Sequence, residues 1–414
     1  MAADELTPGS GKYSPLPKSR RRGIGLCLSG GGFRATLFHL GALRRLNELG
    51  VLTRDDFRTV AAVSGGSIVA AHLATVLARL ARPAPGTAIP TDLWDREVRD
   101  PLRAFTRRDH RTGPFLRRFV PWRIWRTETT IEALARRYEK DLTALRLADL
   151  PERPEFLFLA TDMAYGVSFE FSRSRMGDWQ AGYMDTPPDF PLARAVAASS
   201  CFPPLFGPLR LHFEPGALTG GSAPRGPERD ACLSDFRLTD GGNYDNMGLE
   251  PVWKDHAIVL VSDAGGLFTN EGDKGLLWRL PRYAGIQERQ ARALRKRWLI
   301  ASYVNGTVEG AYWGVGSAAS HYDLSYPGYS EAFAREVIAQ IRTDLDAFSD
   351  AEAAVLENHG YLLVEAAARK HVPEMAGLAP HRVPHPEWLP PLRTEAALRA
   401  ALADSARRRT WGRG

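Results

Sequence analysis

The sequence of 414 residues is poor in cysteine and has no long apolar run. Its three cysteines, Cys27, Cys201 and Cys232, show no CxxC spacing, so neither a disulfide framework nor a zinc cluster is predicted, and a reducing, cytoplasmic compartment is favoured. The most apolar long window, Ser67 to Ala81, contains a histidine, a threonine and an arginine. It falls short of the roughly 20 apolar residues that span a membrane. Any membrane contact is therefore expected to be peripheral, at the inner face of the membrane.

An excess of charge of one sign is also missing. The chain has 54 Lys and Arg residues and 48 Asp and Glu residues, a net charge of +6, which is too small to predict a nucleic-acid partner. Residues 1–22 are polar and end in the basic run Lys18–Arg22, without the apolar stretch of a secretion signal. We expect this segment to be a flexible basic leader.

Sequence signals for nucleotides and metals are absent as well. No G-x-x-x-x-G-K-[ST] pattern occurs, and the G-x-G at Gly23–Gly25 precedes a predicted strand, whereas a dinucleotide fingerprint follows one. No calcium-binding loop is found. We expect no metal and no cofactor, and the sequence does not indicate an oligomeric state.

Two strand–turn–helix units follow each other near the N-terminus. The apolar run Ile24–Ser29 stops at the glycines Gly30–Gly32, and leucines then recur at helical spacing. A second unit consists of Thr59–Val63, the turn Ser64–Gly66 and the helix-compatible stretch Ser67–Leu80. Such tandem units predict an α/β fold with a mostly parallel sheet and helices packed on it.

The remainder of the chain divides into a core, an insertion and a helical region. We expect a core over residues 23–265, a cap insertion at about 83–150, and a mainly helical extension over 266–414. Ser349 and Glu352 form a capping box before one of the helices. Further strands are predicted at Phe156–Ala160, Val167–Phe171 and Ala257–Val261, and further helices at Tyr283–Tyr303, Glu331–Ala347 and Ala351–Lys370.

Two loops in the tandem units combine glycine with chemically useful side chains. Gly30, Gly31, Gly32 and Arg34 lie where a strand meets a helix, so their backbone N–H groups could bind an oxyanion or a phosphate. Ser64 sits at the second strand–helix turn among small residues, which is typical of a nucleophile elbow. Each loop taken alone is equally compatible with a plain turn.

A serine nucleophile needs a base, and several acids and histidines are candidates. Asp240 stands in the Asp-Gly-Gly loop that follows the apolar stretch Phe236–Leu238. Asp263, before another Ala-Gly-Gly, is the second choice. His39 and His72 lie inside predicted helices, where a packing or surface role is expected. The remaining candidates, all close to predicted strand ends, are Asp162, Asp245 and His256.

These motifs, together with the block Ala198–Phe206 (ASSCFPPLF), resemble in their joint order the patatin-like phospholipase family. The resemblance spans about residues 25–248. It implies a three-layer α/β/α sandwich and a phospholipase A or lysophospholipase activity that cleaves lipid acyl esters through a Ser-Asp dyad. It also implies the site residues: Ser64 as nucleophile, Asp240 as base, Gly30, Gly31 and Gly32 as oxyanion hole, and Arg34, Gly66, Gly241 and Gly242 in support.

One position departs from the family pattern. The family elbow is written G-x-S-x-G, and this chain has Ala62 in place of the first glycine, while Gly66 is retained. A dyad without histidine remains chemically sound, because burial raises the pKa of a carboxyl group and oxyanion stabilisation supplies the larger share of catalysis. The alternative is a catalytically inactive module of the same fold that binds a lipid or a partner.

Arginine and aromatic residues alternate between Arg103 and Arg126. Cationic side chains bind anionic head groups and aromatic rings suit the membrane interface, so this segment predicts docking on an anionic phospholipid surface. The alternative is a basic cap whose aromatic rings pack against the body. The candidate contact residues are Arg117, Arg118, Trp122, Arg123 and Trp125.

Overall fold

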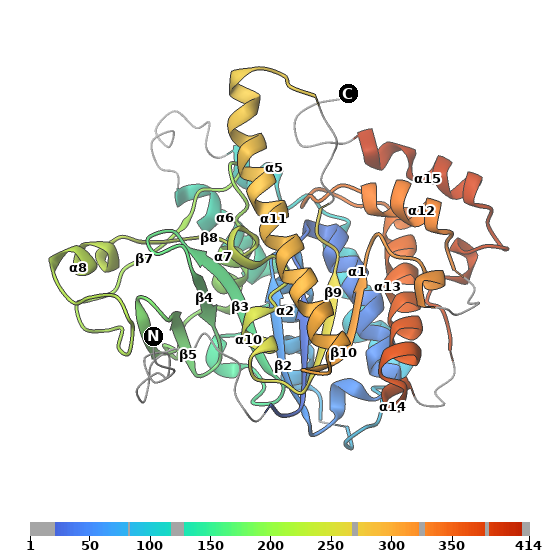
Figure 1. The fold of residues 1–414 in the computed structure, drawn as a ribbon, viewed down its shortest axis with the longest axis horizontal. Helices are drawn as coiled ribbons and strands as arrows, with labels where there is room; N and C mark the ends of the chain where they lie inside the picture. The colour runs from blue at the N-terminus through green and yellow to red at the C-terminus, as the bar shows by residue number, and fades with distance from the viewer. Residues whose placement is uncertain are drawn as a thin grey trace.

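The computed structural model describes residues 21–81, 83–116, 128–266, 272–322, 328–376 and 381–407. A ten-stranded sheet forms its centre (Figure 1). Five neighbouring strands are parallel, in the order β10-β9-β1-β2-β3. Their bounds are β1 Ile24–Leu28, β2 Phe57–Val63, β3 Glu155–Asp162, β9 Ile258–Asp263 and β10 Glu309–Gly314.

Beyond β3 the sheet continues with antiparallel strands. β4, β5 and β6 follow one another outward from β3, and β7 pairs with β8. Their bounds are β4 Ser168–Phe171, β5 Arg175–Asp178, β6 Gly182–Asp185, β7 Leu209–Leu211 and β8 Phe236–Asp240.

The register on β3 brings two distant segments end to end. β2 runs along β3 as far as the pair Val63–Leu159, and antiparallel β8 runs toward it as far as the pair Asp240–Ala160. Because β4 also pairs with Ala160, on the other edge of β3, β8 must share the edge that β2 occupies. The residue after Val63 therefore lies next to the end of β8.

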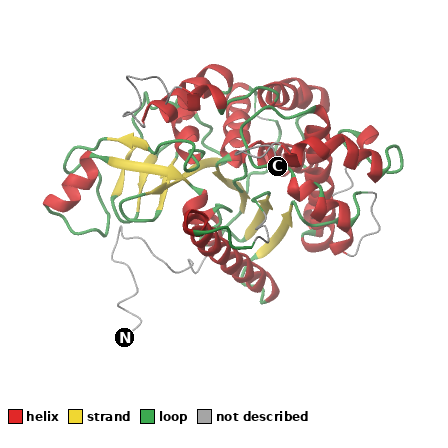
Figure 2. Cartoon of the chain, turned by 90° about the horizontal axis from the view of Figure 1, so that it is seen from above, coloured by secondary structure: helices red, strands yellow, loops and turns green. Residues whose placement is uncertain are grey.

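Alternation along the parallel strands explains the layers on either side. Ile24, Leu26 and Leu28 of β1 join one buried apolar cluster, whereas Cys27 joins a second cluster on the opposite face. Helices α1 (Gly32–Glu48), α2 (Gly65–Arg79) and α7 (Leu192–Ser199) contact the sheet within the first cluster. Helices α10 (Glu250–Trp253) and α11 (Leu276–Val304) cover the second. Seen from above, helices lie on both sides of the strands (Figure 2). The predicted three-layer α/β/α sandwich with a mostly parallel sheet is confirmed.

Helices fill the predicted insertion and most of the C-terminal region. The first group, up to the end of the insertion, is α1 Gly32–Glu48, α2 Gly65–Arg79, α3 Thr91–Trp94, α4 Asp100–Thr106, α5 Thr112–Leu116 and α6 Glu128–Asp141. The second group is α7 Leu192–Ser199, α8 Pro227–Ser234, α9 Gly242–Asp245, α10 Glu250–Trp253 and α11 Leu276–Val304. The last is α12 Glu331–Glu336, α13 Asp350–His371, α14 Pro373–Ala376 and α15 Glu395–Arg407.

The C-terminal region is joined tightly to the core. β10 completes the parallel part of the sheet, and α13 packs along α1. Two glycines permit this close crossing, because a Cβ on Gly41 would collide with the carbonyl of Glu357, and one on Gly360 with the carbonyl of Phe38. The predicted capping box of Ser349 and Glu352 does open α13.

The secondary structure of this region differs from the sequence analysis in two places. The sequence analysis named no strand at Glu309–Gly314, and its prediction of one helix over Glu331–Ala347 is wrong. In the structure the helix ends at Glu336, and after a short 3₁₀ turn at Ile338–Gln340 the backbone becomes irregular. The physical reason is that backbone carbonyls in this stretch accept hydrogen bonds from Phe33 and Arg34 in α1, as described below.

Candidate active site

Ser64 has the strained backbone expected of an elbow. Its φ of 51° and ψ of −116° make it the one described non-glycine residue with positive φ, a conformation that costs about 1–3 kcal/mol. The strain is held by a hydrogen bond of 2.9 Å from its amide to the Oγ of Ser199. The positive N-terminal end of α2 begins at the next residue. Ala62 fits as an ordinary buried residue of β2, paired with Leu28 and Phe158.

The structure brings Asp240 to Ser64. The Oδ1 atom of Asp240 accepts a hydrogen bond of 2.8 Å from the Gly242 amide, and the buried Oδ2 atom has no partner of ordinary geometry among the described residues. Burial raises the pKa of Asp240 to about 7, while the Gly242 amide and the nearby Ser64 hydroxyl lower it. The two side chains therefore interact, through a contact looser than a standard hydrogen bond, as is common before substrate binds.

The glycine loop offers two amides rather than three. The Gly30 amide donates to the carbonyl of Asn246 at 2.9 Å, so it cannot serve as the predicted oxyanion donor. Gly31 and Gly32 adopt φ values of 141° and 55°, which favour glycine. Within the described part of the chain, neither of their amides donates to another group.

Close backbone contact fixes this loop against the elbow. A Cβ on Gly65 would collide with the carbonyl of Gly32, and one on Gly66 with the carbonyl of Leu28. A Cβ on Gly30 would lie 3.1 Å from that of Ser64. The glycine loop and the serine therefore share one small space, and Gly66 packs directly against the end of β1.

The Asp-Gly-Gly loop closes the third side of this space. A Cβ on Gly241 would collide with the carbonyl of Leu159, and one on Gly242 would lie 2.7 Å from Oδ1 of Asn246. The Asn246 amide group also occupies the space that a side chain on Gly30 would need. Asn246 thus lies between the two glycine loops, and the sequence analysis overlooked it.

Arg34 supports the glycine loop from behind. Its guanidinium could either add positive charge to the site or hold the loop in place. Its buried donors go to backbone carbonyls: that of Ala264 at 2.8 Å and 3.2 Å, and those of Ala339 and Ile341 at 2.8 Å each. The Phe33 amide donates to the carbonyl of Asp344 at 2.8 Å. These bonds explain why the chain leaves the helical conformation after Glu336.

The second-choice base, Asp263, is already engaged. It accepts hydrogen bonds from Arg292 at 2.7 Å, Tyr312 at 2.8 Å and Gly265 at 3.0 Å. Although burial opposes it, these partners lower the pKa of Asp263 to about 2. A carboxylate held in this way is a weak proton acceptor.

The other acids and the histidines have structural partners. Asp162 accepts from the amides of Ala164 and Tyr165, and Asp245 from those of Met247, Leu249 and Glu250. His39 bridges Ser29 and Ser262, and His72 bonds to backbone carbonyls of the insertion. His256 bonds to Thr59 and Val252 at the opposite end of the strands from Ser64.

Ser199 is a positioning residue that the sequence analysis named only within the block Ala198–Phe206. Its hydroxyl accepts from the Ser64 amide and donates to the carbonyl of Leu159 at 2.6 Å, and its own carbonyl accepts from the Gly241 amide at 3.2 Å. It thereby connects the serine turn to the Asp-Gly-Gly loop. Only its place in a run of small residues before a proline pair could have drawn attention to it.

If the ester hydrolysis that the family resemblance implies takes place here, we expect Ser199→Ala to lower its kcat by roughly 10- to 100-fold with little change in KM, because the strained turn loses its anchor. The buried Ser64 amide would lose its acceptor, at a cost of about 1–3 kcal/mol in stability. Ser199→Thr keeps the hydroxyl and should restore most of kcat. Ser200→Ala is the matched control, since Ser200 is equally buried but bonds to Val196. Equal kcat in Ser199→Ala and Ser200→Ala would contradict the positioning role.

Two further parts of the molecule bear on the predictions. The predicted membrane-contact residues Arg117, Arg118, Trp122, Arg123 and Trp125 lie outside the described residues, as do residues 1–20 of the predicted leader.

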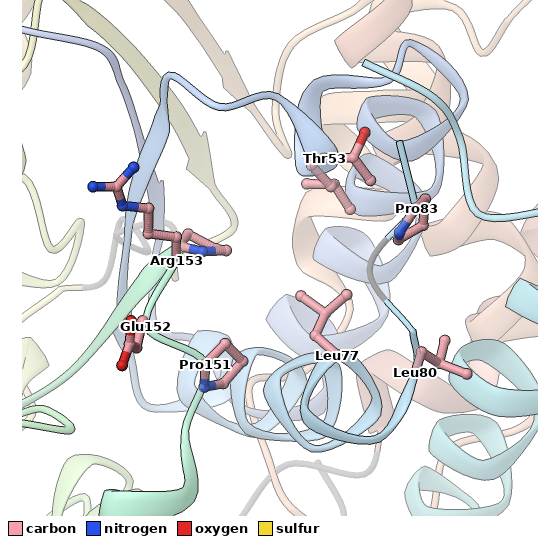
Figure 3. Close-up of a pocket in the computed structure, with 9 residues that line it drawn as sticks. Thr53, Leu77, Leu80, Pro83, Pro151, Glu152 and Arg153 are labelled. Carbon is pink, nitrogen blue, oxygen red and sulfur yellow. The ribbon is translucent and has the colours of Figure 1, made fainter. Parts of the chain in front are cut away.

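A pocket of about 430 Å³ lies far from Ser64, between the start of β3 and the end of α2. Figure 3 shows Pro151 and Arg153 on one side of it and Leu77 and Pro83 on the other.

Comparison with known proteins gives one extended match. The sequence model of the patatin-like phospholipase family matches residues 26–253, more than half of the chain. No curated protein sequence matches. Human GIVD cytosolic phospholipase A2 aligns with a TM-score of 0.46 at 14% identity, over 86% of this chain and 60% of that one. VipD from Legionella pneumophila aligns with a TM-score of 0.35 at 15% identity, over 86% and 68%. On the family match, the chain belongs to the patatin-like phospholipase family, a family of lipid hydrolases.

Proposed function

We propose that the protein cleaves carboxylic esters of membrane lipids, as a phospholipase A or a lysophospholipase, with Ser64 and Asp240 as its catalytic dyad. The observation that carries this proposal is the meeting of three loops: the strained serine turn, the end of β8 with its buried carboxyl, and the glycine loop with two uncommitted amides. Each of these elements alone is an ordinary turn.

The chemistry follows from the roles of the groups. The Ser64 Oγ attacks the ester carbonyl carbon while its proton passes to Asp240, and the carbonyl oxygen becomes an oxyanion. The Gly31 and Gly32 amides donate to this oxyanion, and the N-terminal end of α2 adds its positive potential. Collapse of the intermediate breaks the ester C–O bond, and Asp240 returns the proton to the departing alcohol. Water, deprotonated by Asp240, then attacks the acyl-serine, and the fatty acid and the free hydroxyl of Ser64 result.

The buried position of the dyad supports an apolar substrate. Ser64 and Asp240 are each 6% exposed, and a carboxyl with a pKa of about 7 exchanges its proton near neutral pH. A general base whose pKa lies near the working pH is the most effective. A phospholipid or another acyl-ester lipid at an anionic, cytoplasmic membrane surface is the proposed substrate.

A labelling experiment tests the proposal against the inactive-module alternative. A fluorophosphonate phosphonylates a serine only where a base and an oxyanion site activate it. We expect stoichiometric labelling of Ser64, located by peptide mass spectrometry, and release of fatty acid from total membrane lipid by the unlabelled protein. Ser64→Ala should show neither. Folded protein that takes up no label and releases no fatty acid would identify an inactive module.

A further inference from the structure

Helix α11 carries an exposed apolar stripe that the proposed chemistry does not use. Leu276, Leu280, Tyr283, Leu294 and Trp298 are 73%, 68%, 58%, 59% and 42% exposed. At 100° per residue, these five positions fall within about 60° of the helix circumference. Large apolar side chains gathered in this way on one helix mark an interaction surface.

The charge on the same helix is almost all basic. α11 contains seven Lys and Arg residues and one acid, Glu288. Glu288 lies toward Asp240, whose pKa it raises, whereas Arg279 and Arg297 are exposed and lie about 40° from the apolar stripe around the helix. Asp273, just before the helix, pairs with Arg279 at 2.6 Å. The outward surface of α11 therefore combines apolar and cationic groups.

The C-terminal half of α11 is fastened to the core beside the candidate site. Arg292 pairs with Asp263 at 2.7 Å and Arg295 with Asp245 at 3.8 Å. Leu299 is buried on the sheet, and the Tyr303 hydroxyl donates to the carbonyl of Val259 at 2.7 Å. This half therefore fixes the direction of the whole helix.

The N-terminal half of α11 extends past the carboxyl ends of the parallel strands, where Ser64 lies. Arg292 stands at the carboxyl end of β9, and the 16 residues before it span about 24 Å at 1.5 Å per residue. Figure 1 shows this upper end of α11 rising clear of the other helices. Its apolar stripe thus projects beyond the edge of the molecule that holds the proposed dyad.

We propose that the outward face of α11 docks the protein on an anionic lipid surface, with Leu276, Leu280 and Tyr283 inserted among the lipids. This inference rests on the proposed function, since docking there would present the dyad to its substrate. Lipid acyl chains would bury the apolar side chains of the stripe, and anionic head groups would form ion pairs with the arginines. A second copy of the chain on the same face would bring arginines against arginines, which disfavours self-association.

Vesicle co-sedimentation tests this docking surface. All variants are made on Ser64→Ala, so that lipid is not consumed, and are mixed with phosphatidylcholine vesicles with or without phosphatidylglycerol. We expect Leu276→Ser with Leu280→Ser to weaken binding to the anionic vesicles by roughly 100-fold, since a leucine that leaves the lipid loses at least tenfold in affinity. Arg279→Gln with Arg297→Gln should weaken binding by roughly tenfold or more. Leu392→Ser is the control, because Leu392 is also 73% exposed but lies just before α15.

Kinetics on two substrates separate failure of this inference from failure of the proposed function. With Ser64 intact, the leucine variant should hydrolyse a water-soluble short-chain ester at the wild-type rate and anionic vesicles at least tenfold more slowly. A protein without esterase activity would refute the proposed function, yet its vesicle binding would still decide the docking. Unchanged binding in both α11 variants would overturn the inference. So would a wild-type dimer, seen by light scattering, that the leucine changes dissociate while vesicle binding stays the same.

Discussion

Replacing Ser64 by alanine is expected to lower the rate of ester hydrolysis by about four orders of magnitude or more. The variant loses the only atom that would form the acyl bond, and the glycine-loop amides alone would retain a modest acceleration over water. The measurement is the initial rate on a fluorogenic short-chain ester, with wild type and variant at equal concentration.

The backbone at position 64 makes stability a necessary control. Alanine is no better suited than serine to a φ of 51°, so the melting temperature of Ser64→Ala should stay near that of the wild type. Ser234→Ala, at an exposed serine of α8, should keep the full rate. A Ser64→Ala protein that melts normally and still turns over the ester would exclude Ser64 as the nucleophile.

Asp240→Asn is expected to lower the rate by about three orders of magnitude or more, because the amide cannot accept the serine proton. In the wild type the carboxyl must be ionised to act as a base. With a pKa of about 7, kcat/KM should rise tenfold per pH unit below this value and level off above it. A flat pH profile between pH 5 and about 8 would contradict the assignment of Asp240 as the base.

The same carboxyl predicts an unusual pH dependence of stability. Its folded pKa, about 7, lies above the ordinary value of 3.8, so between these values the folded state holds a proton that the unfolded state has lost. Stability therefore falls as the pH rises through this window, by up to roughly 4 kcal/mol. Asp240→Asn has no carboxyl at this position to titrate. Its free energy of unfolding should therefore rise relative to that of the wild type between pH 5 and pH 8.

Asp263 is the matched comparison, because its shift has the opposite sign. Its folded pKa of about 2 lies below 3.8, so its stabilising contribution is present above pH 3.8 and disappears as the pH falls through 2. Asp263→Asn should therefore lower stability at neutral pH, by roughly 2 kcal/mol or more. Normal turnover in Asp240→Asn, together with complete loss in Asp263→Asn, would transfer the role of base to Asp263.

How far the sequence could predict this site depends on the range of the interactions involved. The glycine loop, the serine turn and the Asp-Gly-Gly loop are local motifs, and their residues are recognisable without a structure. The hydrogen bond from the Gly30 amide to the Asn246 carbonyl could not be predicted, because the two residues lie 216 positions apart along the chain. The same holds for Ser199, whose hydroxyl is indistinguishable from its neighbours until the serine turn packs against it.

The elements of the fold also divide into those that local sequence determines and those that distant contacts determine. Strands β1 and β2 and their helices follow from periodicity, because their apolar patterns agree with their local conformation. β10 escaped prediction because its residues Glu309–Gly314 include two glycines and two aromatic residues without clear alternation, and pairing with β9 decides its conformation. Residues 337–347 likewise leave the helix that their composition predicts. Their carbonyls at Ala339 and Ile341 accept hydrogen bonds from the buried Arg34 guanidinium, and that of Asp344 accepts one from the Phe33 amide, so tertiary bonds outweigh local preference.

The bonds from Arg34 and Phe33 to the stretch around residues 339–344 have an evolutionary consequence. The partners there are main-chain oxygens of Ala339, Ile341 and Asp344, atoms that every amino acid carries. These bonds therefore constrain the length and path of the stretch independently of its side chains. A one-residue insertion or deletion there would move the carbonyls away from their donors, and we expect such length changes to be rare among homologues.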